Sequence, residues 1–88
     1  MNFRECLGKG LIKKDAKAVE RIENSIEIAE RFLRSARRNF DLKDYVMVEI
    51  AAYNSAFHSA RTLLFAKGYK ERSHYCLVVA VRNLTEMM

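Results

Sequence analysis

Apolar residues recur at helical spacing along almost the whole chain of 88 residues. The chain contains no proline, and no alternation of apolar and polar residues extends beyond a few positions. Apolar residues three and four positions apart indicate amphipathic helices rather than strands. The chain is therefore predicted to be all-α, an antiparallel up-and-down helical bundle of about four helices in a single domain, residues 1–88.

A first long helix is predicted from Asp15 to Phe40. It carries one narrow apolar stripe, as expected of a helix that packs in a bundle: Val19, Ile22, Ile26, Ala29, Leu33, Ala36 and Phe40. Its acidic residues come first and its arginines last, an order that complements the helix dipole. Arg31 and Arg34 each follow a glutamate by four residues, and Arg37 and Arg38 complete the cluster. Helix stability therefore explains much of this cluster, and a binding role is the less favoured alternative.

A second long helix is predicted from Leu42 to Lys67, capped by Asp41 and stopped by Gly68. The connection between the two helices is too short for anything but a hairpin. The second helix is apolar on nearly every side, so one neighbour cannot cover it. A second copy of the chain is the expected partner, and the candidate interface residues are Tyr53, Phe57, Leu64, Val78 and Val81.

Three polar residues interrupt this apolar helix on one side: Asn54, His58 and Arg61. At about 100° per residue they fall within roughly 60° of one another. One interpretation is a buried, hydrogen-bonded stripe that fixes helix register or a dimer. The other is contact with a ligand, because a histidine and an arginine can transfer a proton and bind a phosphate. The sequence leaves both open.

Shorter helices are predicted at the two ends of the chain. Asn2, with Glu5 three residues later, can begin a short helix that Gly8 and Gly10 would end. Ser73 is a suitable N-cap for a last helix. Nothing at the end of that helix resembles a capped end, so a final helix of the bundle is expected to be missing, divergent or supplied by another chain.

The composition describes a small basic domain, with a net charge of +5 and half of its residues hydrophobic. A domain of this size has little interior in which to bury them, which again favours self-association. Lys67, Lys70 and Arg72 fall in the loop before the last helix, where a basic patch could meet nucleic acid. A solvated surface is the alternative.

Cys6 and Cys76 are isolated cysteines, without a CxxC motif. Together with the two histidines they show no metal-ligand spacing, so we expect buried or free thiols, no metal and no cofactor. Met1 to Ile12 is too short and too charged for a signal-peptide core, and no run approaches the ~20 apolar residues of a membrane span. A cytoplasmic protein without membrane contact is expected.

The run "AAYNSAFHSARTLLFAKGYKERSHYCL", with the upstream "LIKKDAKAVERIENSIEIAERFLRSA", resembles the HEPN family, the higher eukaryotes and prokaryotes nucleotide-binding domain. The resemblance covers Leu11 to Leu84 and rests on residue type combined with spacing: Tyr53, Asn54, Phe57, His58, Ala60, Arg61, Gly68, Tyr69, Ser73 and His74. It implies a helical bundle, frequently a homodimer, that accompanies a minimal nucleotidyltransferase in a toxin-antitoxin-like pair. The candidate nucleotide or RNA contacts are Asn54, His58, Arg61, Lys70, Arg72, Ser73 and His74.

Several branches of that family are metal-independent RNases with an R-x(4-6)-H motif near the end of the bundle. Here Met87 follows Arg82 where the shortest version of the motif needs histidine. The resemblance therefore implies a binding and interaction module without assigned catalytic residues. Two alternatives remain open: an RNase that uses His58 or His74 with Arg61 or Arg82, and a purely structural helical oligomer.

Overall fold

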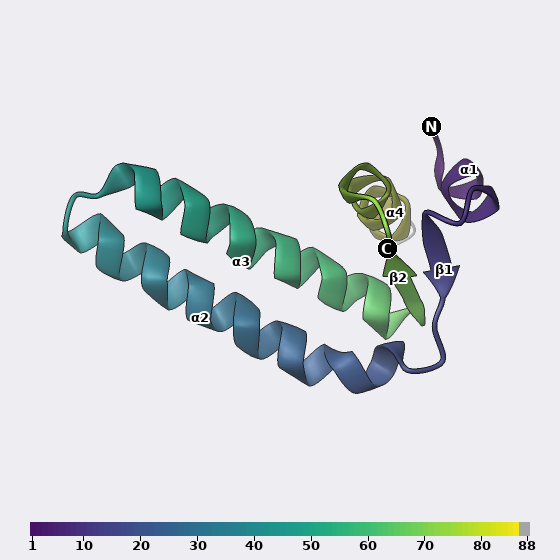
Figure 1. Cartoon of the computed structure of the whole chain (residues 1–88), viewed down its shortest axis with the longest axis horizontal. Coiled ribbons are helices and arrows are strands. Elements are labelled where there is room, and N and C mark those ends of the chain that lie inside the picture. Colours follow the sequence, from purple (N-terminus) through teal and green to yellow (C-terminus); the bar gives the residue numbers. More distant parts are fainter. Residues whose placement is uncertain (87–88) are drawn as a thin grey trace.

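The computed structural model describes residues 1–86, which form four α-helices and a two-stranded sheet (Figure 1). In chain order these are α1 (Phe3–Gly8), β1 (Ile12–Lys14), a 3-10 turn (Ala18–Arg21), α2 (Ile22–Asp41), α3 (Tyr45–Ala66), β2 (Tyr69–Glu71) and α4 (His74–Glu86). The predicted all-α fold is confirmed. None of the helices in this part of the chain is long and apolar enough to cross a membrane.

The helices α2 and α3 form the predicted hairpin and lie side by side along the length of the molecule (Figure 1). Two predicted boundaries are wrong. The first long helix begins at Ile22 and not at Asp15, because the N–H of Asp15 donates to the carbonyl of Gly68 beside the sheet and a 3-10 turn follows.

The cap of α3 is Asp44 and not Asp41. The Asp44 carboxylate accepts a hydrogen bond from the backbone N–H of Met47 at 3.3 Å. Lys43 takes a left-handed φ of 61°, which ends α2 and turns the chain. At the other end of α3, Gly68 has the left-handed φ expected of its stop, 82°.

Small side chains make the contact between α2 and α3. Ala29 and Ala36 of α2 are buried there with Ala51 of α3. The Ser25 and Thr62 hydroxyls lie 2.7 Å apart across the contact. The Ser55 hydroxyl also donates a hydrogen bond to the backbone carbonyl of Ala29 at 2.8 Å. Small residues let the two backbones approach closely, and the hydroxyl groups between the helices find hydrogen-bond partners across the contact.

The larger residues of the predicted stripe are therefore not buried in the hairpin. Val19, Ile26, Leu33 and Phe40 are between 43% and 62% exposed. They flank the line of alanines, where no third long helix covers them among the described residues. The periodicity correctly places one side of α2 toward α3, but the prediction that the whole stripe packs in a bundle is wrong for this chain on its own.

The helix α4 crosses α3 instead of running along it, so it is seen almost end-on in Figure 1. The hydrophobic core lies at this crossing, where Leu64 of α3 meets Leu77 and Ala80 of α4. Beyond the crossing the same side of α3 is uncovered, with Val46, Ile50 and Tyr53 between 49% and 68% exposed. We call these three residues the bare face of α3. Its exposure follows from the direction in which α4 leaves the hairpin.

A two-stranded antiparallel sheet joins the start of the chain to the segment after α3, and the sequence did not predict it. Ile12 pairs with Glu71, Lys13 with Lys70, and Lys14 with Tyr69. Strands of three residues are too short to produce a recognisable alternation. The two strands are also distant in sequence, so no hairpin signal connects them.

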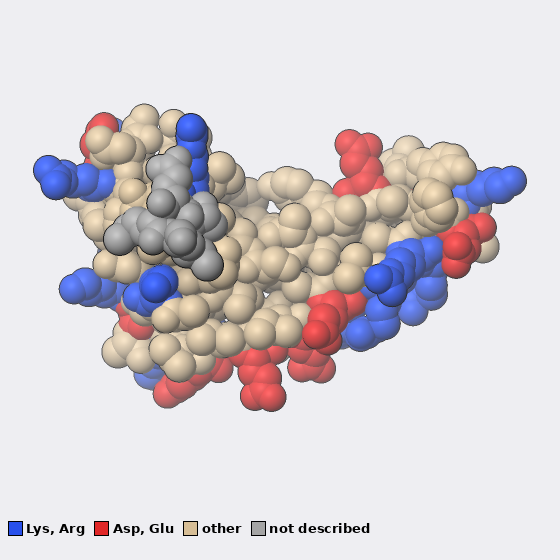
Figure 2. Space-filling view, turned by 180° about the vertical axis from the view of Figure 1, so that it is seen from behind, with Lys and Arg blue, Asp and Glu red and all other residues tan. Residues whose placement is uncertain are grey.

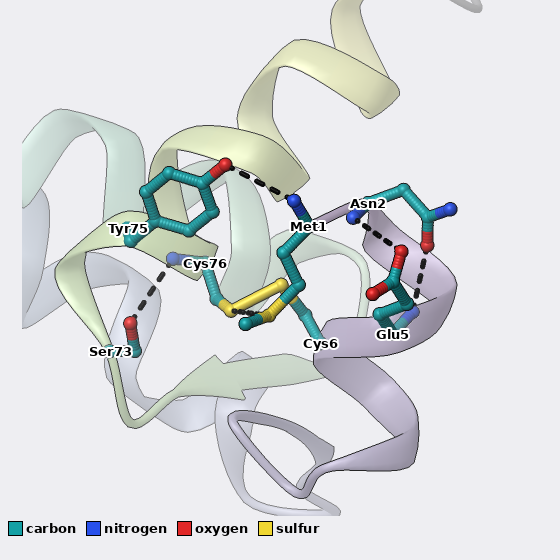
Figure 3. The surroundings of a disulfide bond; sticks show 7 residues. All are labelled: Met1, Asn2, Glu5, Cys6, Ser73, Tyr75 and Cys76. Carbon is teal, nitrogen blue, oxygen red and sulfur yellow. Dashed lines mark hydrogen bonds between the residues drawn. A yellow bond between two sulfur atoms is a disulfide. The ribbon is translucent and has the colours of Figure 1, made fainter.

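Cys6 and Cys76 form a disulfide that joins α1 to α4 (Figure 3). Both residues are fully buried, as predicted, but the expectation of separate thiols is wrong. Their Cα atoms lie 5.8 Å apart, a normal spacing for a disulfide. The short helix α1 begins as predicted, with reciprocal hydrogen bonds between Asn2 and Glu5. The disulfide therefore fixes a locally well-capped helix against the core.

Candidate functional site

Two of the three residues of the polar stripe on α3 bond within the fold. The Asn54 side-chain amide donates to the backbone carbonyl of Ile50, one turn earlier, at 2.9 Å. Arg61 forms an ion pair with Glu71 of β2, with its Nε 2.8 Å from Oε1. The Glu71 side chain is only 7% exposed and that of Arg61 31%. This pair therefore ties the helix to the sheet and largely shields the carboxylate from water.

His58 lies between two phenylalanine rings. The Phe32 ring of α2 is nearly parallel to the imidazole at 5.8 Å between centroids, and the Phe57 ring is nearly perpendicular at 5.4 Å. Burial lowers the pKa of His58, the nearby Arg61 lowers it further, and Glu71 opposes them. Its Nδ1 is buried and has no hydrogen-bond partner within the described residues. These surroundings favour the neutral imidazole.

The contacts of the stripe favour the structural alternative over the ligand-binding one. Asn54 satisfies a helix carbonyl, His58 fills space between α2 and α3, and Arg61 neutralises a buried carboxylate. A ligand at Arg61 would have to displace Glu71, and it would leave that carboxylate without its cation. The midhelix stripe is therefore a poor place for a phosphate group.

A groove of about 500 Å³ lies between α3 and α4. Its walls are apolar except for His74 and Arg82 of α4. The His74 ring lies 4.6 Å from that of Phe57 between centroids. The residues that line the groove are Tyr53, Ala56, Phe57, Ala60, His74, Leu77, Val78, Val81 and Arg82. Because Tyr53 also belongs to the bare face of α3, the groove and that face form one continuous apolar surface.

Four of the five candidate interface residues line this groove: Tyr53, Phe57, Val78 and Val81. The prediction is wrong for the fifth residue, Leu64, because its side chain is fully buried in the core and unavailable to a partner. Periodicity cannot separate these residues on a helix that is apolar on all sides. The position of α4 decides which are covered.

The basic loop is largely strand β2, and the sheet adds a residue that the sequence did not single out. Lys13 of β1 is the cross-strand partner of Lys70. Like charges in that position destabilise a sheet, so an anion there would relieve repulsion. Arg72 continues the pairing, since its N–H donates to the carbonyl of Leu11 at 2.8 Å. By strand alternation Lys70 and Arg72 lie on the same face.

Ser73 and His74 occupy the start of α4. The Ser73 hydroxyl accepts a hydrogen bond from the N–H of Cys76 at 3.3 Å, which confirms the predicted cap. His74 is exposed at the mouth of the groove. The structure thus places His74 and Arg82 along one groove, and the Phe57 ring contacts both His74 and His58 of the α3 stripe. Met87, on which the comparison with the RNase motif depends, lies outside the described residues, and in residues 1–86 no three metal-ligating side chains gather.

Comparisons with known proteins show the family to which the chain belongs. The family model described as "HEPN domain" matches residues 22–88, which include α2, α3 and α4. The chain is also similar to a protein of Methanocaldococcus jannaschii named as a candidate toxin, with 39% identity over 66 residues. That match covers 75% of this chain and 48% of the relative, so the chain spans about half of the relative's length. No solved structure matches. The chain belongs to the HEPN family.

Proposed function

We propose that this HEPN domain is a toxin-like interaction module that associates through the groove between α3 and α4 and the adjoining bare face of α3. The observation that carries the proposal is the exposure of large apolar side chains there, 59% for Tyr53 and 66% for Val78. Isolated exposed hydrophobic residues are common, but a concave, continuous set marks an interaction surface. The similarity to a candidate toxin supports a role within a toxin-antitoxin-like pair.

The proposed partners are a second copy of the chain and a nucleotidyltransferase of the minimal type. A second copy suits the surface because the bare face is a single helical stripe, which can pack on its own symmetry mate about a two-fold axis. Fully burying one of these side chains contributes about 1.5 to 3 kcal/mol, so a few of them can offset the cost of association. The nucleotidyltransferase would contact the pair of HEPN domains in the complete complex.

A nucleotide or RNA is the proposed ligand, bound at the basic surface formed by Lys13, Lys70 and Arg72. None of the three forms an ion pair within residues 1–86. His74 is near in sequence and exposed, so it can add a hydrogen-bond donor. Cations of this kind hold phosphate groups without any catalytic base.

A second candidate function is a metal-independent RNase, and one observation favours it. His74 and Arg82 line the same groove, so a proton acceptor and a cation face one space. That combination is what 2′-hydroxyl activation and phosphate stabilisation require in kind. In the family motif the arginine precedes the histidine, whereas here His74 precedes Arg82. For this reason we place binding without cleavage ahead of RNase activity.

Self-association is tested by light scattering on Val78→Asp, with Val19→Asp as the matched control. The two valines are almost equally exposed, at 66% and 62%, but Val19 lies outside the groove. We expect Val78→Asp to dissociate a dimer that Val19→Asp leaves intact. Co-purification with a nucleotidyltransferase encoded beside this chain tests the second partner. A monomer at all micromolar concentrations that also fails to retain the nucleotidyltransferase would refute the proposal.

Ligand binding is tested by titrating a fluorescent nucleotide and a short RNA at two salt concentrations. Binding through phosphate contacts weakens as salt increases, because counterions are released. We expect the double substitution Lys70→Gln and Arg72→Gln to weaken binding and to reduce its salt dependence. Lys9→Gln with Lys17→Gln removes equal charge outside this surface and should have little effect. No response at low salt would favour the purely structural oligomer.

A further inference from the structure

The second half of α2 carries four exposed arginines, Arg31, Arg34, Arg37 and Arg38, toward the tip of the hairpin. Figure 2 shows the resulting division of charge along the edge formed by α2, with acidic side chains near its start and a basic group near the tip. At about 100° per residue, three of the four share one side of the helix within roughly 60°. They form a row about 10 Å long, from residue 31 to residue 38. We call Arg31, Arg34 and Arg38 the arginine row.

The structure removes the explanation that the sequence offered for these arginines. Their spacing from Glu27 and Glu30 is suited to ion pairs within the helix, yet none of the four arginines forms an ion pair in residues 1–86. Ion pairs are formed elsewhere in the fold, by Arg21 with Asp15 and by Arg61 with Glu71. The dipole of the helix accounts for at most the cations in its last turn. A row of like charges without carboxylate partners is a surface suited to an anion.

A recess of about 420 Å³ lies along one side of the row and is lined by two of its members, Arg31 and Arg38, with Ile28. Phe32 and Ser35 contribute an aromatic ring and a hydroxyl to its lining. The Phe32 ring also lies nearly parallel to the His58 ring of α3, with 5.8 Å between centroids, which restricts its movement. The recess thus combines a restricted aromatic surface with the guanidinium groups of Arg31 and Arg38. A nucleotide needs this combination, because its base stacks and its phosphates pair with arginine.

The geometry points to a binding site for single-stranded nucleic acid on α2. Successive phosphates contact the arginine row, and one base enters the recess against Phe32. An extended row matches a chain of phosphates better than a single anion, and an unpaired base is needed to reach the ring. This inference rests on the proposed function in taking nucleic acid as the ligand. It adds a site distinct from the surface around Lys70, because the arginine row lies on another element.

The test is fluorescence anisotropy with twelve-residue oligo(U) and oligo(dT) over a series of salt concentrations. Three phosphate contacts on a single strand predict that the logarithm of the association constant falls with the logarithm of salt with a slope of about −2 from this site. The affinity of the variant R31Q/R34Q/R38Q should be at least tenfold lower at low salt. Its salt dependence should also be weaker, because the contribution of these three phosphate contacts to the slope is removed. Glutamine preserves helix propensity, so the hairpin should still fold, and a circular dichroism melt confirms that it does.

The matched control is R4Q/K9Q/K17Q, which removes the same charge from exposed residues outside the row. It should change affinity less than twofold. Equal losses in the two triple variants would mean that only net charge matters, and would overturn the inference. An oligomer without bases should bind at least fivefold more weakly, and equal affinity would overturn the role of the recess. Equal competition by polyglutamate would identify an acidic protein surface as the ligand instead.

The K70Q/R72Q variant separates this inference from the proposed function. Loss of oligonucleotide binding in K70Q/R72Q, with full binding by R31Q/R34Q/R38Q, would overturn the site on α2 and leave the proposed function standing. Loss in the arginine variant, with nucleotide binding at Lys70 retained, supports a separate site. No binding of any oligonucleotide by the unaltered protein would overturn the site on α2 and the proposed RNA binding at Lys70, and would leave the proposed association through the groove standing.

Discussion

The ion pair between Arg61 and Glu71 should respond very differently to removal of its two partners. The Glu71 side chain is 7% exposed, whereas that of Arg61 is 31% exposed. Removing one member of a fully buried pair costs about 3 to 5 kcal/mol, because the remaining charge has no compensation. Arg61→Met leaves the more buried charge behind and also removes the guanidinium from the Phe57 and Phe65 rings, at 5.7 and 5.2 Å. After allowing for the partial exposure of the pair, we expect a loss of about 2 kcal/mol.

Glu71→Gln should cost only about 1 kcal/mol, because the arginine it leaves can reach water and the glutamine can still accept a hydrogen bond. Urea unfolding followed by circular dichroism measures both substitutions and their double variant. The double variant should be more stable than the sum of the single losses predicts, by about 1 kcal/mol. A Glu71→Gln loss equal to or larger than that of Arg61→Met, or a coupling near zero, would refute the assignment of this pair as a support of the fold.

Three other predictions concern protonation, the disulfide and catalysis. Because the pKa of His58 is lowered in the folded protein from 6.5, the unfolded chain binds more protons below that pH. The free energy of unfolding should therefore fall as pH decreases from about 7.5 to 5.5, and His58→Gln should reduce this dependence; an unchanged dependence would contradict the prediction. The disulfide links residues separated by 70 positions, so the chain-entropy model gives a contribution of about 4 kcal/mol. Reduction should lower the Tm by at least about 10 °C, and a Tm unaffected by reductant would show that the bond is absent in solution. The chain should not cleave RNA at the rate of an active HEPN RNase, because Met87 replaces the histidine base of the motif and loss of a general base usually costs about 10² to 10⁴ in rate. Cleavage that disappears in His74→Ala or Arg82→Ala would reverse the order of the two candidate functions.

The helices could be predicted because their signals are local. The Asn2 cap, the Ser73 cap and Gly68 each act within a few residues, and the structure places these three as expected. Apolar spacing located both long helices but not the start of α2, which is Ile22 and not Asp15. The sheet and the disulfide depend on segments more than 50 residues apart, and neither has a local signal. The same limit applies to Leu64 and Tyr53, which occupy the same apolar helix but differ in exposure because α4 covers only one of them.

The candidate site divides in a similar way. Residue type alone made His58 and Arg61 candidate ligand contacts, but Phe32 and Glu71, which surround them, come from other elements. Lys13 could not be selected because its position opposite Lys70 depends on the sheet. The arginines of α2 were noticed, and helix stability was preferred as their explanation. Only the absence of their ion pairs in residues 1–86 changes that preference.

The boundary of the family match does not coincide with the boundary of the folding unit. The match begins at residue 22, yet Cys6 and Ile12 belong to the same buried cluster as Leu64 and Leu77. A recombinant fragment cut at residue 22 would retain every long helix and still open the hydrophobic interior to water on one side. Such a fragment should aggregate or unfold, even though it contains everything that a comparison between relatives would recognise. For this domain, the helices covered by the family match and the minimum sequence that can fold have to be delimited separately.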